Sequence, residues 1–328
     1  MKRLSVNSLA QRVPAHHRGT AALLLVILAC LGIQISTAVA APLLDRISPL
    51  SLAGLRSFCA AIVLLILVRP RVSKLKKSDW PQVILYGVVV TFLNIGYFSA
   101  IKYIPLGIAV TIEFLGAFGV SLLGVQRARD GLISLGALAG VILIAGPSFE
   151  STQIVGYLWA AMSALCMAGY TLLSARMGHG SPAVEGLKGL AISICISALL
   201  LSPLSVPVMG EIGWDGWLRV ALAGSMGIAL AYSSDAVAAR LTSAAVIGVL
   251  LSLDPVVGAL IGTVVMGQVL PLPAYLGILL IAASGALLVW KTNRSAIAIS
   301  AHHPNTAILD AIVEAKTGQL PIIRPEDR

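Results

Sequence analysis

Apolar segments of about 20 residues recur along the chain, and they constrain its fold more than any other feature. A helix needs about 20 predominantly apolar residues to cross a hydrocarbon core about 30 Å thick. Of the 328 residues, 58% are hydrophobic and 11% are charged, whereas a soluble domain carries about 25% charged residues. We therefore expect an all-α integral membrane protein with ten transmembrane helices: Thr20–Ala41, Ile47–Val68, Pro81–Ile101, Leu106–Val125, Gly131–Ile144, Gly156–Met177, Ala183–Leu201, Trp217–Val237, Ala244–Met266 and Pro273–Trp290.

The first apolar segment follows a basic amino-terminal stretch, as a secretory signal would. It is longer than a usual signal core, and nine further segments follow it, so we expect it to be retained. The four cysteines lie singly in apolar segments, and the histidines lie in tails or loops. These positions predict no disulfide, no metal site and no cofactor.

The distribution of basic residues predicts the orientation. With the amino terminus inside, 18 of the 23 Lys and Arg residues fall in cytoplasmic segments, and the outer segments hold Arg46, Lys102 and Arg219. Positive charge favours the cytoplasmic side, so both termini are expected there. The polar tail from Lys291 to Arg328 is expected to be disordered, apart from a short helix near Ala307–Ala315.

Weak internal similarity suggests a duplication. An offset of 138 residues aligns Lys102 with Arg240, and a second register pairs Ser48-Pro49 with Ser181-Pro182. Two copies of a five-helix unit must cross the membrane in opposite directions, which gives an inverted repeat with a central cavity near the midplane.

Two carboxylates lie deep within predicted spans, where ionisable groups are costly and are candidates for function. Glu113 is either a proton carrier in an alternating cavity or a structural ion-pair partner of Lys102 or Arg56. Asp254 precedes Pro255 in the middle of the ninth span, so it marks either a site or a packing kink.

Three further ionisable residues lie within or near spans. Arg56 offers a planar fork suited to a carboxylate, with an internal ion pair as the alternative. Lys188 and Asp235 lie closer to span ends, from which they can reach water. Five uncharged polar residues at depth are candidate ligand contacts, although each also suits contacts between helices: Gln34, Asn94, Tyr97, Tyr170 and Tyr232.

Several function classes lack their motifs in the sequence. There is no GxxxxGK[ST] phosphate loop, so direct coupling to ATP within this chain is not expected. HExxH and GxSxG are also missing, which argues against an intramembrane enzyme.

One set of motifs carries a resemblance to a known family. It consists of Asn94, Tyr97, the run Tyr103-Ile104-Pro105-Leu106-Gly107-Ile108-Ala109-Val110 and the pair Glu113-Phe114. With these residues the chain resembles the EamA-type permeases of the drug/metabolite transporter superfamily, and among them the threonine/homoserine exporter subgroup. Further matches are Ile33-Gln34, Tyr170, Ala231-Tyr232-Ser233 and Ser252-Leu253-Asp254-Pro255.

The resemblance implies an inner-membrane permease of two EamA repeats that exports small amino acids by proton exchange. The chain departs from the exporter pattern at Ala117 and Ala231, where the pattern has proline, and at Asp254 and Gln268, where it has glutamate. The resemblance implies functional roles for Gln34, Asn94, Tyr97, Glu113, Tyr170, Tyr232 and Asp254.

We therefore expect a secondary transporter that works by alternating access, with Glu113 or Asp254 exchanging protons and Arg56 helping to receive a substrate carboxylate. The predicted repeats are residues 19–145 and 156–290, flanked by cytoplasmic segments 1–18 and 291–328. The alternatives are a permease for another metabolite or a cationic drug, and a non-transporting sensor or assembly subunit. The expected partners are a small-molecule substrate and membrane lipid, not nucleic acid, with a monomer and a homodimer both open.

Overall fold

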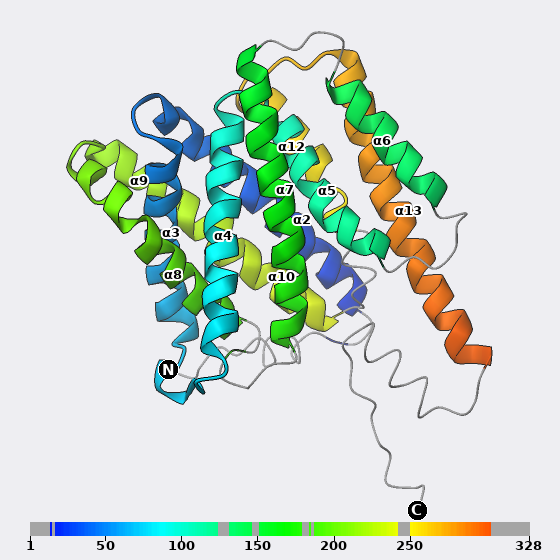
Figure 1. Cartoon of the computed structure of the whole chain (residues 1–328), viewed down its shortest axis with the longest axis horizontal. Coiled ribbons are helices and arrows are strands. Elements are labelled where there is room, and N and C mark those ends of the chain that lie inside the picture. The colour runs from blue at the N-terminus through cyan, green and yellow to red at the C-terminus, as the bar shows by residue number, and fades with distance from the viewer. Residues whose placement is uncertain are drawn as a thin grey trace, which may run out of the picture.

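The computed structural model shows a bundle of helices (Figure 1). It describes residues 14, 17–123, 131–145, 151–178, 184, 187–241 and 250–302. Every regular element in these ranges is helical, which confirms the all-α fold class. The α-helices are α2 (Arg18–Ala40), α3 (Pro49–Val68), α4 (Trp80–Ile101), α5 (Leu106–Leu123), α6 (Gly131–Ala145), α7 (Ser151–Gly178), α8 (Leu187–Ser205), α9 (Gly213–Gly224), α10 (Ala231–Leu241), α12 (Asp254–Val264) and α13 (Leu272–His302). Short 3₁₀ turns are η2 (Ala41–Asp45), η3 (Val72–Lys74) and η5 (Pro207–Gly210), and η6 (Ser225–Leu230) is a π-helix.

In the part of the chain that the structure describes, each predicted span overlaps a helical segment, whereas residues 124–125 of the fourth span, 183 and 185–186 of the seventh and 244–249 of the ninth lie outside the described residues. The eighth span is the continuous run from α9 through η6 to α10, and the ninth contains α12. Among the described residues, five helical segments are long and apolar enough to cross a membrane. Shorter apolar helices there are Leu106–Val120, Leu135–Ile144, Asp254–Val264 and Leu272–Leu287.

The outer faces of the helices suit a hydrocarbon solvent. On α7, Leu158 is 66% exposed and Leu165 is 76% exposed. Residues seven apart lie on the same face of a helix, two turns from each other. An apolar face of this kind is costly in water and favourable in lipid.

The helix contacts follow an inverted repeat. Taking α2 to α6 as the first half and α7 to α13 as the second, α3 packs on α8, α5 on α12 and α6 on α13, so the second, fourth and fifth helices each meet their counterparts. The third helix α4 packs on α7, the first helix of the other half, and α10 of the eighth span correspondingly packs on α2. Exchanging the two halves leaves this pairing scheme unchanged, as expected for two copies of opposite topology.

The carboxyl-terminal boundary differs from the prediction. α13 continues past Trp290 to His302, so the prediction of a disordered tail is wrong for residues 291–302. This stretch contains no Gly or Pro and includes Ala296 and Ala298, so the helix can continue without a breaker. The predicted short helix near residues 307–315 lies outside the described residues.

The ninth span is broken rather than kinked. α12 begins at Asp254, with Pro255 in its first turn, and residues 252 and 253 form a turn before it. The Leu253 amide donates to the Leu250 carbonyl, at 3.1 Å, across this turn. Proline in a first turn sacrifices no backbone hydrogen bond. The prediction that Asp254-Pro255 lies inside a continuous helix is therefore wrong, and Asp254 instead occupies a helix amino terminus.

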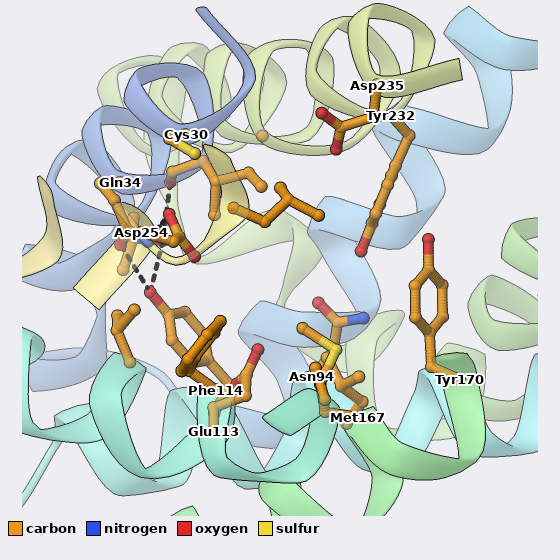
Figure 2. A pocket seen from close by; sticks show the side chains of 18 of the residues that line it. Cys30, Gln34, Asn94, Glu113, Phe114, Met167, Tyr170, Tyr232, Asp235 and Asp254 are labelled. Carbon is orange, nitrogen blue, oxygen red and sulfur yellow. Dashed lines mark hydrogen bonds between the residues drawn. The ribbon is translucent and has the colours of Figure 1, made fainter. Parts of the chain in front are cut away.

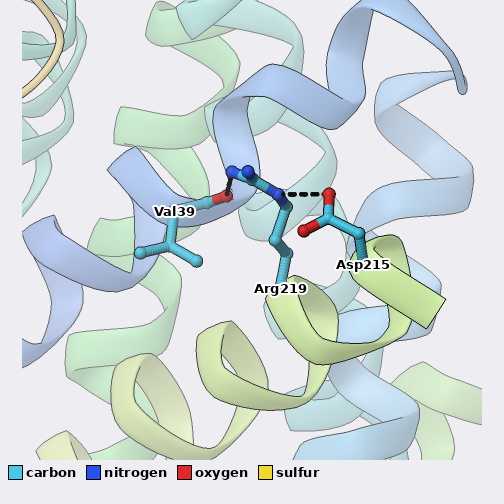
Figure 3. A network of polar contacts seen from close by, with 3 residues as sticks. All are labelled: Val39, Asp215 and Arg219. Atoms are coloured by element: carbon cyan, nitrogen blue, oxygen red, sulfur yellow. Dashed lines mark hydrogen bonds and ion pairs between the residues drawn. The ribbon is translucent and has the colours of Figure 1, made fainter.

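The eighth span is distorted by the π-helix η6, and its first helix, α9, is tied to α2. The Arg219 guanidinium pairs with Asp215 at 2.9 Å and donates to the carbonyl of Val39 near the end of α2, at 3.4 Å (Figure 3). Both charged side chains are solvent-accessible, so the pair contributes at most about 1 kcal/mol. Gly227 in η6 allows close approach to α3, because a Cβ there would lie 2.7 Å from Arg56 Nη2.

Candidate functional site

A cavity of about 390 Å³ lies between the two halves (Figure 2). This volume is in the usual range for small-molecule sites, about 300 to 1,000 Å³. Its walls come from helices of both halves, as an inverted repeat predicts. The lining residues are Cys30, Ile33, Gln34, Thr37, Arg56, Leu93, Asn94, Tyr97, Val110, Glu113, Phe114, Ala117, Phe118, Met167, Tyr170, Thr171, Gly227, Ile228, Tyr232, Asp235, Leu251, Asp254 and Gly285.

All eight residues selected from the sequence line this one cavity: Gln34, Arg56, Asn94, Tyr97, Glu113, Tyr170, Tyr232 and Asp254. Asp235, which the sequence placed near a span end, also lines it. Lys188 does not, because it lies exposed in the first turn of α8. The eight residues and Asp235 thus lie around one cavity, while the role of each residue stays a prediction.

Asp254 is the end of a hydrogen-bonded chain that crosses between the halves. Gln34 Nε2 donates to Asp254 Oδ1 at 2.9 Å. The Tyr97 hydroxyl lies 3.1 Å from Gln34 Oε1 and 3.3 Å from Thr37 Oγ1, so it can donate to either acceptor. Gln34 is only 1% exposed, so its amide holds the carboxylate in a fixed position at the cavity wall.

Glu113 is held by a different contact. The Ser163 hydroxyl lies 2.6 Å from Glu113 Oε2 and 3.2 Å from the carbonyl of Leu93. In the part of the chain that the structure describes, no cation lies within ion-pair distance of Glu113. The alternative in which Glu113 is a structural ion-pair partner of Lys102 or Arg56 is therefore not what the structure shows.

Arg56 is a buried cation with spare hydrogen-bonding capacity. Its side chain is 3% exposed, and its Nη2 donates to Ser36 Oγ at 3.3 Å and to the Ala223 carbonyl at 3.5 Å. Both distances are longer than those of ordinary N–H···O bonds, which cluster near 2.9 Å. The guanidinium also lies 4.4 Å from the centre of the Phe98 ring, within range of a cation–π contact.

No described carboxylate neutralises this guanidinium. Arg56 forms no ion pair with any residue in the described ranges, and its buried Nε has no hydrogen-bond partner there. A buried polar group without a partner is costly. The arrangement indicates a place for an anionic group of a ligand.

Aromatic side chains form the other wall of the cavity. The Tyr86 and Tyr170 rings stack with centroids 5.3 Å apart, and Tyr170 and Tyr232 are tilted with centroids 5.9 Å apart. Asn94 lies between this wall and the carboxylates, and its Nδ2 donates to the Val90 carbonyl at 2.9 Å. The amide oxygen of Asn94 is thereby left as an acceptor.

A comparison of the chain with known families decides what kind of protein has this architecture. The EamA-like transporter family matches residues 20–149 and 154–290. The chain belongs to this family. It is therefore a membrane permease with two five-helix repeats, and it is grouped with transporters rather than with enzymes.

Two exporters are similar to this EamA-like chain over most of their length. Threonine/homoserine exporter RhtA of Escherichia coli strain K12 is 27% identical over 236 residues, which cover 70% of this chain and 78% of that protein. The protein of the same name from Salmonella typhimurium strain LT2 is 25% identical over the same length. A solved crystal structure with 20% sequence identity aligns with a TM-score of 0.59, covering 84% of this chain and 99% of that one, which supports the fold.

Sequence reasoning missed several residues of this EamA-like site. Ser163 lies seven positions before Tyr170 on α7, so helical periodicity placed it on the same face. Thr37 likewise lies three positions after Gln34 on α2. Gly227 gave no comparable signal, because its proximity to Arg56 depends on the π-helix and on contacts between distant segments.

Proposed function

We propose that this permease exports a small zwitterionic amino acid, similar to threonine or homoserine, from the cytoplasm in exchange for protons. The observation that carries the proposal is the buried, unneutralised guanidinium of Arg56 in the same cavity as the carboxylates of Glu113 and Asp254. The similarity to the threonine/homoserine exporters of E. coli and Salmonella supports the substrate class.

A zwitterion matches the charges of the cavity. Arg56 is suited to the α-carboxylate, because a guanidinium donates two parallel hydrogen bonds to a carboxylate. Glu113 and Asp254 offer acceptors for the α-ammonium. Such charge-assisted bonds are each worth about 1.5 to 3 kcal/mol, and a ligand lacking either group leaves a buried charge of the protein unpaired.

The uncharged polar residues supply selectivity. Gln34 donates to the Asp254 carboxylate, and the Tyr97 hydroxyl lies within hydrogen-bond distance of the Gln34 amide oxygen. Gln34 therefore orients that carboxylate, and Tyr97 orients Gln34, which leaves little freedom for ligands of other shapes. Tyr170 and Tyr232 present two hydroxyls from the aromatic wall, and Asn94 presents an amide between that wall and the carboxylates. The hydroxyl of a threonine-like side chain can bond to these groups.

Proton coupling follows from competition for the carboxylates. An ammonium group and a proton each neutralise Glu113 or Asp254, and the two cannot do so at one oxygen at the same time. If substrate leaves when a proton arrives from outside, and the proton leaves when substrate binds from inside, one carboxylate links the two fluxes. The exchange needs no other energy source in this chain.

The fold supports alternating access. In an inverted repeat the site lies between the halves, and rocking of one half on the other exposes it to the two sides in turn. The positive-inside distribution of Lys and Arg supports an inner-membrane protein with both termini in the cytoplasm. In this scheme the two repeats are residues 19–145 and 156–290, with cytoplasmic segments at 1–18 and 291–328.

Counterflow in proteoliposomes tests the proposal. Vesicles containing the purified protein are loaded with unlabelled threonine or homoserine, and uptake of labelled amino acid is followed with and without an imposed pH gradient. We expect exchange above that of empty vesicles, and net efflux that accelerates when the side receiving the substrate is acidic. Absence of exchange for both amino acids refutes the substrate class, while exchange without any response to pH refutes the coupling.

A permease for an organic cation is the second candidate. It is favoured by the apolar part of the lining, which includes Ile33, Phe114, Phe118 and Met167. Counterflow of ethidium in the same vesicles, with no counterflow of labelled threonine or homoserine, would favour this candidate over amino-acid export.

A further inference from the structure

We propose that the end of the cavity formed by Asp235, Tyr232 and Tyr170 is a second cation subsite, so that the permease also accepts basic amino acids. The subsite would take the side-chain ammonium of a diamino acid such as lysine or ornithine. This inference rests on the proposed function, because Arg56 and the other carboxylates are taken to hold the α-carboxylate and the α-ammonium.

Asp235 has a buried oxygen without a hydrogen-bond partner among the described residues. Its side chain lines the cavity, and its Oδ1 accepts no hydrogen bond from any residue that the structure describes. The other two cavity carboxylates differ in this respect, since Glu113 accepts from Ser163 and Asp254 accepts from Gln34. Leaving a buried acceptor of this kind unpaired costs several kcal/mol for a charged group, and a ligand that donates to Asp235 removes this cost.

The neighbours of Asp235 suit an ammonium group in particular. Tyr232 lies three positions earlier on α10, so the two side chains share a helix face. Figure 2 shows Asp235 beside Tyr232, with Tyr170 pointing toward them from α7, and the two tyrosine rings are 5.9 Å apart between centroids. Aromatic faces attract cations, most strongly where water is excluded. A carboxylate next to two rings therefore favours a cation over a neutral donor.

The charge balance of the cavity points the same way. Its lining holds three carboxylates, at Glu113, Asp235 and Asp254, and one guanidinium, at Arg56. A neutral zwitterion leaves this balance unchanged, because it brings one charge of each sign. A diamino acid brings an additional positive charge, which offsets one of the excess carboxylates and leaves another for the coupled proton.

The positions of the charges also fit a ligand with two separate ammonium groups. Figure 2 shows Asp254 with Gln34 and Cys30 at one end of the cavity, and Asp235 with Tyr232 at the other. A chain with cationic groups at its two ends can bond to a carboxylate at each end.

Competition between matched amino acids tests the subsite. L-lysine and L-norleucine share the α-amino acid group and a six-carbon chain, and they differ in the ε-ammonium. We measure the concentration of each that half-inhibits counterflow of labelled threonine by the wild-type protein. We expect lysine to act at a concentration lower by about tenfold or more, as one charge-assisted hydrogen bond provides. Labelled lysine should itself exchange above empty vesicles.

Two variants assign the preference to Asp235. In Asp235→Asn the advantage of lysine over norleucine should disappear. Glu211→Gln removes an exposed carboxylate that does not line the cavity, and it should keep the advantage. If Asp235→Asn fails to fold, thermal unfolding of the wild-type protein decides instead, because lysine should raise its melting temperature more than norleucine at equal concentration.

The outcomes separate this inference from the proposed function. Threonine exchange by the wild-type protein with no advantage of lysine over norleucine refutes the subsite and leaves amino-acid export standing. An advantage that survives in Asp235→Asn also refutes it. If threonine is not exchanged at all, the proposed function fails, and exchange of labelled lysine still tests whether a diamino acid is carried.

Discussion

Replacing Arg56 by glutamine tests whether the cavity recognises a carboxylate. In the structure this guanidinium makes two long hydrogen bonds, to Ser36 and Ala223, and a cation–π contact with Phe98. Glutamine can keep a bond to Ser36 and removes a charge that is 97% buried and unneutralised by the described protein. The loss of internal contacts is therefore offset by the loss of a charge that is costly to bury, and we expect Arg56→Gln to fold.

The effect on the substrate should be larger than the effect on folding. A charge-assisted hydrogen bond to a substrate carboxylate contributes about 1.5 to 3 kcal/mol, which corresponds to roughly a 10- to 150-fold change in affinity. We expect the KM for threonine counterflow to rise by about this factor in Arg56→Gln. Arg56→Lys keeps the charge but loses the planar fork, so its KM should fall between those of the wild type and the glutamine variant.

A change of substrate distinguishes recognition from a structural role. In the wild type, threonine should compete much better than threoninamide, in which a neutral amide replaces the carboxylate. In Arg56→Gln this difference should vanish, since the group that recognises the carboxylate is gone. Arg219→Gln is the matched control, because Arg219 pairs with Asp215 away from the cavity. Retention of the full preference for threonine in Arg56→Gln refutes the assignment, whatever happens to the transport rate.

Three further predictions follow from the same structure. Glu113→Gln and Asp254→Asn should each lose net export driven by a pH gradient, as measured by efflux under an imposed gradient. If the two carboxylates form one relay, the double variant should export no less than the more severe single variant. Gly107→Val should destabilise the protein by about 1 to 3 kcal/mol by overpacking, because a Cβ at Gly107 would lie 2.5 Å from the backbone of α12. Gly119→Val is the control, because a Cβ at Gly119 would meet no atom within 4 Å. Equal melting temperatures of the two variants would contradict this prediction. Gln268→Ala should cost about 1 kcal/mol, because the Gln268 Oε1 accepts from the first amide of α5 at 2.9 Å; an unchanged melting temperature would show that the bond is dispensable.

The sequence was informative about the fold because the membrane restricts the possible solutions. Every backbone polar group in lipid must be bonded within the protein, so each long apolar run has to be a helix. Charges are costly at depth, so the few that occur, such as Arg56 and Glu113, were candidates for a cavity. Position near a helix end correctly indicated an exposed side chain for Lys188, but the same reasoning was wrong for Asp235, which lines the cavity.

What the sequence could not supply were contacts between distant segments. Gln34 and Asp254 are 220 positions apart, and no local pattern predicts that an amide on α2 bonds that carboxylate. Whether Arg56 had an internal ion pair was open for the same reason. The break before Asp254 was also missed, because a proline within an apolar run is compatible with a kink, and the hydrogen bonds that distinguish a kink from a new helix are a property of the folded backbone.

The contacts of the Glu113 and Asp254 carboxylates follow the pseudosymmetry of the helices. Glu113 lies on α5, the fourth helix of the first half, and bonds Ser163 on α7, the first helix of the second half. Asp254 lies on α12, the counterpart of α5, and bonds Gln34 on α2, the counterpart of α7. Each half thus contributes one carboxylate and holds the carboxylate of the other. The donors differ in kind, because Ser163 donates from a hydroxyl and Gln34 from an amide that also lies within hydrogen-bond distance of Tyr97. Equivalent positions of the two halves therefore place their carboxylates in unequal surroundings, so the Glu113→Gln and Asp254→Asn variants need not have equal effects.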